Sequence, residues 1–131
     1  MLGEICVKAP AKINLGLRVL PKRGDGFHDI ESLFATVPLA DDLKVRPLAE
    51  KNVCKVAFGQ ASVPQDNTVA SAYNAAKSVL GVDLPGISVE VTKRIPMGSG
   101  LGGGSSDAAA LLVCLQRLGV AFPKGAADKI A

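Results

Sequence analysis

The sequence predicts an α+β fold, a two-layer sandwich in which a mixed β-sheet carries helices on one face. Three observations support this prediction. About six short apolar or alternating segments are typical of strands, and most of them precede the helices. Two segments with apolar residues at helical spacing lie on either side of the last predicted strand. A doubly wound sheet would instead alternate strands and helices from the start of the chain.

Length and composition point to one domain covering residues 1–131. Hydrophobic residues make up 48% of the chain and charged residues 21%, a balance unlike that of a disordered tail or a coiled coil. The net charge of +3 is too small to indicate a nucleic-acid partner. Without a signal-peptide pattern or an apolar run of membrane-spanning length, we expect a cytoplasmic protein with no membrane partner.

Three widely spaced cysteines predict buried free thiols rather than disulfides or a zinc site: Cys6, Cys54 and Cys114.

The strands are assigned from apolar runs and from period-two alternation. Prolines and the Asp41-Asp42 pair are taken as the ends of strands or as turns. The expected strands cover residues 5–9, ending at Pro10, then 13–19, then 30–37, ending at Pro38, a hairpin of 43–46 with 53–58, and residues 87–92.

The helices are assigned from apolar spacing and from capping residues. Asp66 or Asn67 is expected to cap a first helix, which ends at Gly81. A second helix is expected over residues 107–118, stopped by Gly119, and a third is expected to open at Pro123.

A glycine-rich segment separates the last strand from the second helix. Glycines let consecutive backbone amides turn toward one concavity, and the first amides of a helix have no intrahelical partner, so this segment suits a phosphate. The Walker A pattern is absent, and a lone G-x-G-x-x-G is weak evidence, so a tight-packing turn is the structural alternative. The segment consists of Pro96, Met97, Gly98, Ser99, Gly100, Leu101, Gly102, Gly103, Gly104, Ser105 and Ser106.

Four short motifs stand at residues 9–15, 22–28, 30–32 and 100–107. These motifs resemble those of the galactokinase, homoserine kinase, mevalonate kinase and phosphomevalonate kinase (GHMP) superfamily. They appear in the family's order and spacing, and the resemblance covers most of residues 5–120. It implies the ATP-binding N-terminal domain of a small-molecule kinase, with the ribosomal protein S5 domain 2-like fold and with ATP and Mg²⁺ as cofactors. The finer match implies phosphorylation of a hydroxyl on a cytidine-diphosphate-linked methylerythritol in non-mevalonate isoprenoid biosynthesis.

The resemblance also implies roles for individual residues. It places Lys12 by the attacking hydroxyl as the catalytic lysine, and it gives Asn14 a substrate contact. Phe27, in place of the more usual tyrosine, and His28 would receive the cytosine. Residues 96–106 would wrap the ATP phosphates.

The residue types alone leave other interpretations open. Lys12 is then a solvated strand lysine, Phe27 a core residue and His28 a general base. The two serines are helix caps. Asp107 is expected to point away from the loop, because it would repel a phosphate there.

The resemblance also leads us to expect an inactive fragment. The family's catalytic aspartate lies in a Gly-x-Asp-Val-Pro-like segment that matches nothing in residues 1–131, and the family's C-terminal domain is absent. A helix stripe left without partners would favour self-association, through Leu111, Leu115 and Leu118.

Three other functions are weighed against this one. A homoserine- or mevalonate-type kinase is disfavoured by the segment Asp25-Gly26-Phe27-His28. A dinucleotide-binding oxidoreductase needs an acidic residue about 20 positions after the glycines, where Pro123 stands. A non-catalytic nucleotide-binding fragment stays open.

Overall fold

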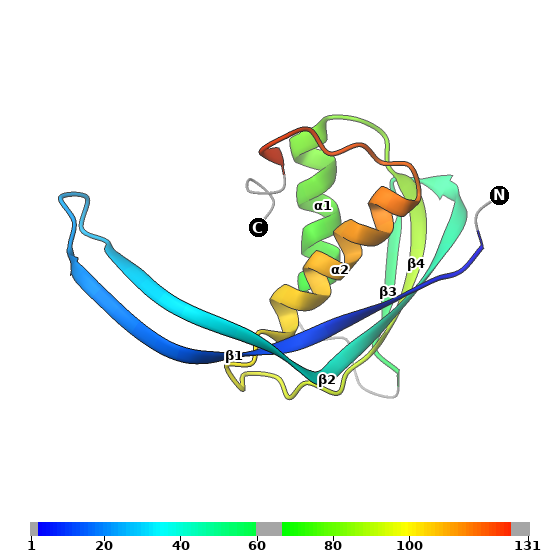
Figure 1. Ribbon diagram of the computed structural model, residues 1–131. Coiled ribbons are helices and arrows are strands. Elements are labelled where there is room, and N and C mark those ends of the chain that lie inside the picture. Colours follow the sequence, from blue (N-terminus) through cyan, green and yellow to red (C-terminus); the bar gives the residue numbers. More distant parts are fainter. Residues whose placement is uncertain (1–2, 60–66, 127–131) are drawn as a thin grey trace.

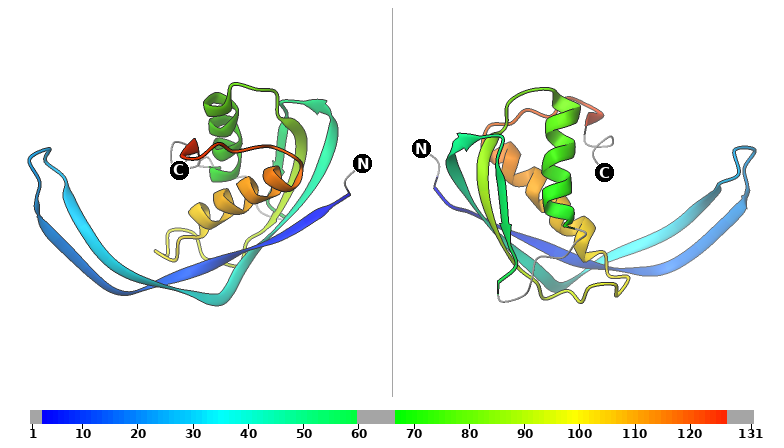
Figure 2. Two further views of the ribbon diagram at one scale, coloured as in Figure 1. Left: turned by 45° about the horizontal axis from the view of Figure 1, so that its top comes forward. Right: turned by 180° about the vertical axis from the view of Figure 1, so that it is seen from behind.

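The computed structural model describes residues 3–59 and 67–126. Their sheet has the strand order β1-β2-β4-β3, formed by β1 (Ile5–Lys22), β2 (His28–Lys51), β4 (Pro85–Thr92) and β3 (Cys54–Ala57). The β1–β2 and β2–β4 pairs are antiparallel, whereas β3 and β4 run parallel. Helices α1 (Thr68–Leu80) and α2 (Gly103–Arg117) lie together on one face of this mixed sheet (Figures 1 and 2). The predicted two-layer α+β sandwich is confirmed.

The first two strands are longer than expected, and the proline breaks were wrong. β1 continues through Pro10 and β2 continues through Pro38, although each proline lacks a backbone donor. Both prolines fall where the register between the two strands shifts, between the pairs Pro10–Ala40 and Lys12–Thr36. Where the ladder is irregular, no backbone N–H donor is needed at these positions, so proline is tolerated inside a strand. The turn expected at residues 41–42 is likewise absent, because both aspartates pair within β2.

The hairpin predicted between residues 43–46 and 53–58 does not form. β4 lies between β2 and β3, so Val45 pairs with Val89, and Val89 pairs with Val56. The physical reason is burial: Ile87, Val89 and Val91 are fully or almost fully buried and therefore belong in the middle of the sheet.

Helix α1 has the predicted caps. Asn67 accepts a hydrogen bond from the Ala70 amide at 3.1 Å, and Gly81 ends α1 in the left-handed conformation with φ of 62°. Asp66 and most of the helix expected from Pro123 lie outside the described residues. No helix in the described part of the chain is both long and apolar enough to cross a membrane.

The core lies between the helices and the sheet. Tyr73 of α1 and both Leu111 and Leu115 of α2 are buried against strand residues such as Leu43 and Val89. Leu111 and Leu115 are 0% exposed and Leu118 is half-buried, so the unpartnered helix stripe expected from the sequence is wrong. Cys114 is buried, but Cys54 is half-buried and Cys6 exposed, so the three free thiols are not all buried as expected.

The exposed apolar side chains lie instead on a hairpin arm. The arm comprises residues 13–34, the distal parts of β1 and β2 with the turn between them, and it extends beyond the helices (Figure 1). Its exposed large apolar residues are Ile13, Leu15, Val19, Phe27, Ile30, Leu33 and Phe34.

Candidate functional site

The glycine loop joins β4 to α2 through alternating left-handed residues. Gly98, Gly100 and Gly102 have φ angles of 68°, 77° and 72°. A side chain is strained in this region, so the sequence needs glycine at these positions. The repeated change of backbone hand turns the intervening amides toward one side, which is the geometry of an anion-binding nest.

Helix α2 begins at Gly103, four residues earlier than expected. Its N-cap is Gly102, and no side chain caps it, so the interpretation of Ser105 and Ser106 as helix caps is wrong. The first intrahelical bond runs from the Ser106 amide to the Gly102 carbonyl, at 3.0 Å. The amides of the preceding residues therefore stand at the positive end of the helix dipole without intrahelical partners.

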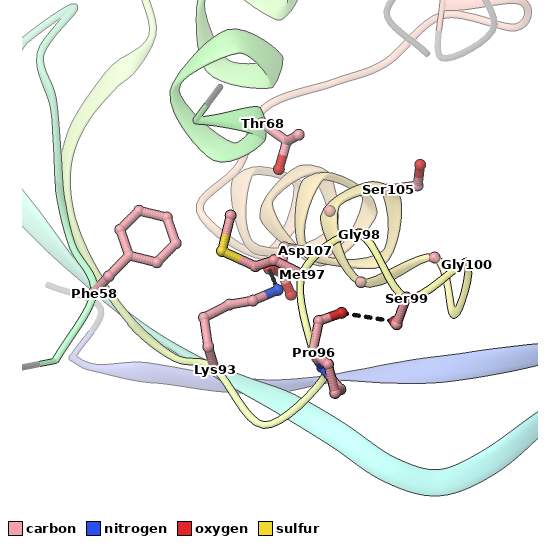
Figure 3. A pocket seen from close by; sticks show the side chains of 13 residues that line it. Phe58, Thr68, Lys93, Pro96, Met97, Gly98, Ser99, Gly100, Ser105 and Asp107 are labelled. Carbon is pink, nitrogen blue, oxygen red and sulfur yellow. Dashed lines mark hydrogen bonds and ion pairs between the residues drawn. The ribbon is translucent and has the colours of Figure 1, made fainter. Parts of the chain in front are cut away.

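A pocket of about 370 Å³ opens over this loop (Figure 3). Nine of the eleven predicted loop residues line it, with Leu101 and Ser106 outside the lining. The other walls come from distant parts of the chain, since Phe58 follows β3 and Thr68 opens α1. The pocket thus combines a helix N-terminus and a glycine nest in a volume suited to a small ligand.

Lys12 packs against the loop rather than pointing into solvent. Its Nζ donates to the Gly100 carbonyl at 3.0 Å, and its backbone amide donates to the Leu101 carbonyl at 3.0 Å. The ammonium also lies 5.5 Å from the centre of the Phe34 ring, within the range of a cation–π contact. The structure therefore brings the predicted catalytic lysine to the edge of the predicted phosphate loop. Its catalytic role stays a prediction.

Three predicted substrate residues belong to the arm: Asn14, Phe27 and His28. Asn14 is exposed and pairs with Phe34, while Phe27 and His28 stand at the tip. Phe27 is 69% exposed, which excludes the core alternative for this residue. His28 Nδ1 lies 2.9 Å from the Leu20 carbonyl and is assigned as the donor, which leaves Nε2 free to accept.

A charged cluster beneath the loop was not predicted. Lys93 Nζ lies 2.6 Å from Asp41 Oδ2 and 3.0 Å from Asp107 Oδ2. Lys93 and Asp107 point toward one another and line the pocket (Figure 3), so the expectation that Asp107 points away from the loop is wrong. A usable signal was present, because Asp41 and Asp107 each lie next to apolar segments, where a charge needs a buried partner.

The two carboxylates of this cluster differ in acidity. Burial, and after it the neighbouring Asp41, raise the pKa of Asp107 to about 7 against the opposing effect of Lys93. Burial also works against ionisation of Asp41, yet hydrogen bonds from Asp107, the Ile95 amide and Lys93 hold the pKa of Asp41 below its ordinary value. The pair thus divides into one charged carboxylate and one that titrates near neutral pH.

Comparisons with known proteins agree with this architecture. Residues 67–129 match the family described as the GHMP kinases N terminal domain. A crystal structure of 4-(cytidine 5'-diphospho)-2C-methyl-D-erythritol kinase matches with a TM-score of 0.73 at 39% identity, covering 97% of this chain and 46% of that one. The homoserine kinase of Cytophaga hutchinsonii matches with a TM-score of 0.66 at 23% identity, which shows the common fold alone. The fold and these matches make this chain similar to the N-terminal domain of GHMP kinases.

Sequence similarity narrows the comparison within that family. The chain is 45% identical over 117 residues to the 4-diphosphocytidyl-2-C-methyl-D-erythritol kinase of Treponema pallidum (strain Nichols). That alignment covers 89% of this chain and 40% of the relative. The chain is therefore similar to the N-terminal portion of these kinases and spans about 40% of the length of the curated relatives it matches.

Proposed function

We propose that this chain is the nucleotide-binding part of an ATP-dependent kinase that phosphorylates a hydroxyl of 4-diphosphocytidyl-2-C-methyl-D-erythritol in non-mevalonate isoprenoid biosynthesis. The observation that carries the proposal is the loop pocket, in a chain similar over 89% of its length to kinases of that name. In this function the amides of residues 98–104 and the N-terminus of α2 bind the ATP phosphates. Phosphoryl transfer asks a protein mainly for positioning and for stabilisation of charge, which such a loop supplies.

In this proposal Lys12 lies beside the acceptor hydroxyl of the substrate. Its ammonium would stabilise the oxygen as negative charge develops there. The hydrogen bond to the Gly100 carbonyl supports this role, because it holds the ammonium at the border between the phosphate pocket and the arm. Asn14 would contact the same substrate along the arm, and the ring of Phe27 would stack on the cytosine while His28 Nε2 accepts a hydrogen bond from it.

Mg²⁺ is the second cofactor of the proposed reaction. The described residues contain no group of three or more His, Cys, Asp or Glu side chains that could hold a metal ion. In this proposal Mg²⁺ is held mainly by the nucleotide phosphates.

The arm indicates a macromolecular contact as well. Apolar side chains such as Leu15, Val19 and Phe34 are exposed together on a structure that projects from the core. Patches of this kind mark interaction surfaces. We infer that the C-terminal part present in the longer relatives covers the arm and completes the cytidine pocket.

Titration of ATP and of cytidine 5'-diphosphate into the purified chain tests the proposal. We expect separate and compatible binding of the two nucleotides, ATP at the loop and the cytidine nucleotide at the arm. A folded chain that binds neither at millimolar concentration would contradict the proposed function. Competition between the two for one site would contradict the assignment of two pockets.

A further inference from the structure

Three charged side chains from three separate segments meet beneath the glycine loop. Asp41 on β2 accepts hydrogen bonds from Lys93 Nζ and from the backbone amides of Arg94 and Ile95, at 2.6, 2.7 and 2.9 Å. Asp107 on α2 shares the same ammonium at 3.0 Å. Asp41 is thus well supplied with donors, whereas Asp107 depends on an ammonium that it must share.

Asp107 has one oxygen without a partner. Its side chain is 2% exposed, and Oδ1 is buried with no hydrogen-bond partner among the described residues. A buried acceptor that carries charge and lacks a donor is costly. One ammonium cannot neutralise two carboxylates, so a proton on Asp107 makes the whole cluster neutral.

Other charged groups around the cluster do not provide this compensation. Among the described residues, the charged groups acting on Asp107 are Lys93 and Asp41. On β1, Lys12 is held at the Gly100 carbonyl, and after β4 the Arg94 guanidinium pairs with Asp42. The one charged residue of α1, Lys77, lies in its last turn, far along the helix from Thr68 at the pocket.

We propose that Asp107 takes up a proton when the glycine loop binds a phosphate-bearing nucleotide, and that it releases this proton when the nucleotide leaves. The inference rests on the proposed nucleotide-binding function. Lys93 and Asp107 both line the pocket, and a Cβ atom placed on Gly103 would lie 3.1 Å from Lys93 Nζ. The ammonium therefore stands beside the first residue of α2, where an anion binds.

An anion at this position changes the balance of charge around Asp107. Phosphate oxygens attract the Lys93 ammonium and repel the Asp107 carboxylate, so both effects favour the neutral carboxylic acid. The proton comes from the solvent and returns to it. Because burial and Asp41 already raise the pKa of Asp107 to about 7, a modest further rise suffices for proton uptake at pH 8. By linkage, affinity for the nucleotide must then fall as pH rises.

Calorimetric titration of ATP at pH 8 in buffers of different ionisation enthalpy measures this proton directly. At pH 8 the phosphate groups of ATP, with a second pKa of about 6, are already ionised and contribute little. We expect an uptake of about 0.5 proton or more per bound nucleotide for the natural chain. Asp107→Asn should bind ATP at least as tightly with this uptake lost, and Glu90→Gln, a change on an exposed strand residue, should retain it.

Each outcome decides a different question. Equal proton uptake by the natural chain and by Asp107→Asn would overturn the inference and leave nucleotide binding intact. Absence of ATP binding in a folded natural chain would overturn both the inference and the proposed function. If Asp107→Asn fails to fold, the natural chain still decides, because its Kd for ATP should rise by up to about tenfold per pH unit between pH 7.5 and 9. A constant Kd over that range contradicts the inference.

Discussion

Gly102 and Lys12 are in contact across the border between the loop and β1. A Cβ atom placed on Gly102 would lie 3.0 Å from Cε and 3.2 Å from Cγ of Lys12, and the φ of Gly102 is 72°. The absence of a side chain at residue 102 therefore serves two purposes. It permits the left-handed turn that opens α2, and it leaves room for the lysine that reaches the Gly100 carbonyl.

Replacing Gly102 tests the loop. Gly102→Ala should weaken ATP binding by at least tenfold. Alanine in the left-handed conformation is strained by about 1–2 kcal/mol, and its Cβ would displace Lys12. Gly16→Ala is the matched control, since a Cβ there meets nothing within 4 Å. Calorimetry showing unchanged ATP affinity in folded Gly102→Ala would contradict a phosphate-binding loop.

Gly103 is constrained for a different reason. Its φ is not positive, but a Cβ would lie 3.0 Å from Ile95 Cγ2 and 3.1 Å from Lys93 Nζ. Crowding rather than backbone strain thus explains this glycine.

The exposed ring of Phe27 permits a test of the arm with little effect on stability. Phe27→Ala should weaken binding of cytidine nucleotides by about 1–3 kcal/mol, the usual contribution of an aromatic–base stack. The midpoint of thermal unfolding should hardly change, because the ring is 69% exposed. Leu33→Ala, an apolar truncation elsewhere on the arm, controls for lost apolar surface. Equal cytidine affinity of natural and Phe27→Ala chains would exclude the stack.

Local signals in the sequence were sufficient for α1 and for the loop, whereas the start of α2 was misplaced by four residues. Asn67 and Gly81 mark the ends of α1 because caps act within a few residues of chain. Prolines misled the strand assignment, since a register shift between β1 and β2 removes the hydrogen bonds that a proline would break. The parallel pairing of β3 with β4 could not be predicted locally, because the whole of α1 separates the two strands.

The candidate site likewise has one part that the sequence predicted and one part that it did not. Residues 96–106 could be recognised because one continuous segment makes the pocket floor. The Asp41, Lys93 and Asp107 cluster joins residues more than fifty positions apart, from 41 to 93 and 107, and no spacing rule connects them. Asp107 looked like an unfavourable charge beside a phosphate loop, and its compensation by Lys93 becomes apparent only in the fold.

The raised pKa of Asp107 predicts how stability depends on pH. The folded chain holds a proton on this carboxyl up to about pH 7, whereas the unfolded chain releases it near 3.8. The resulting stabilisation is therefore fully present below pH 3.8 and is lost as pH rises through 7. Between pH 5 and 7 this group lowers the free energy of unfolding by at most about 1.4 kcal/mol per pH unit.

Denaturant titrations of the natural chain and Asp107→Asn at pH 5, 6, 7 and 8 measure this dependence. The variant should show a flatter profile, because its amide does not titrate. Asp41 does not obscure the comparison, since its lowered pKa keeps it ionised across the whole range. Parallel profiles of the two chains would show that Asp107 is ionised in the folded state throughout.

Two consecutive aspartates of β2 provide a contrast between a buried and an exposed ion pair. Asp41 is 0% exposed and supports Lys93 together with the amides of Arg94 and Ile95, where the chain leaves β4 for the loop. Asp42 lies on the accessible side of the sheet and pairs with Lys8 and Arg94. Their identical chemistry means that a difference between them must come from burial and from the groups left unpaired.

Asp41→Ala should lower the free energy of unfolding by about 3–5 kcal/mol, because it leaves a partly buried ammonium and two backbone amides without their acceptor. Asp42→Ala should cost less than about 1 kcal/mol, since water screens an exposed pair. Denaturant unfolding at pH 7 measures both values. ATP affinity is a second readout. Asp41→Ala should bind ATP more weakly even where the variant is folded, because the entry to the loop is no longer fixed. Asp42→Ala should bind ATP as the natural chain does. Equal destabilisation by the two substitutions would contradict the assignment of Asp41 as the residue that anchors the loop to the sheet.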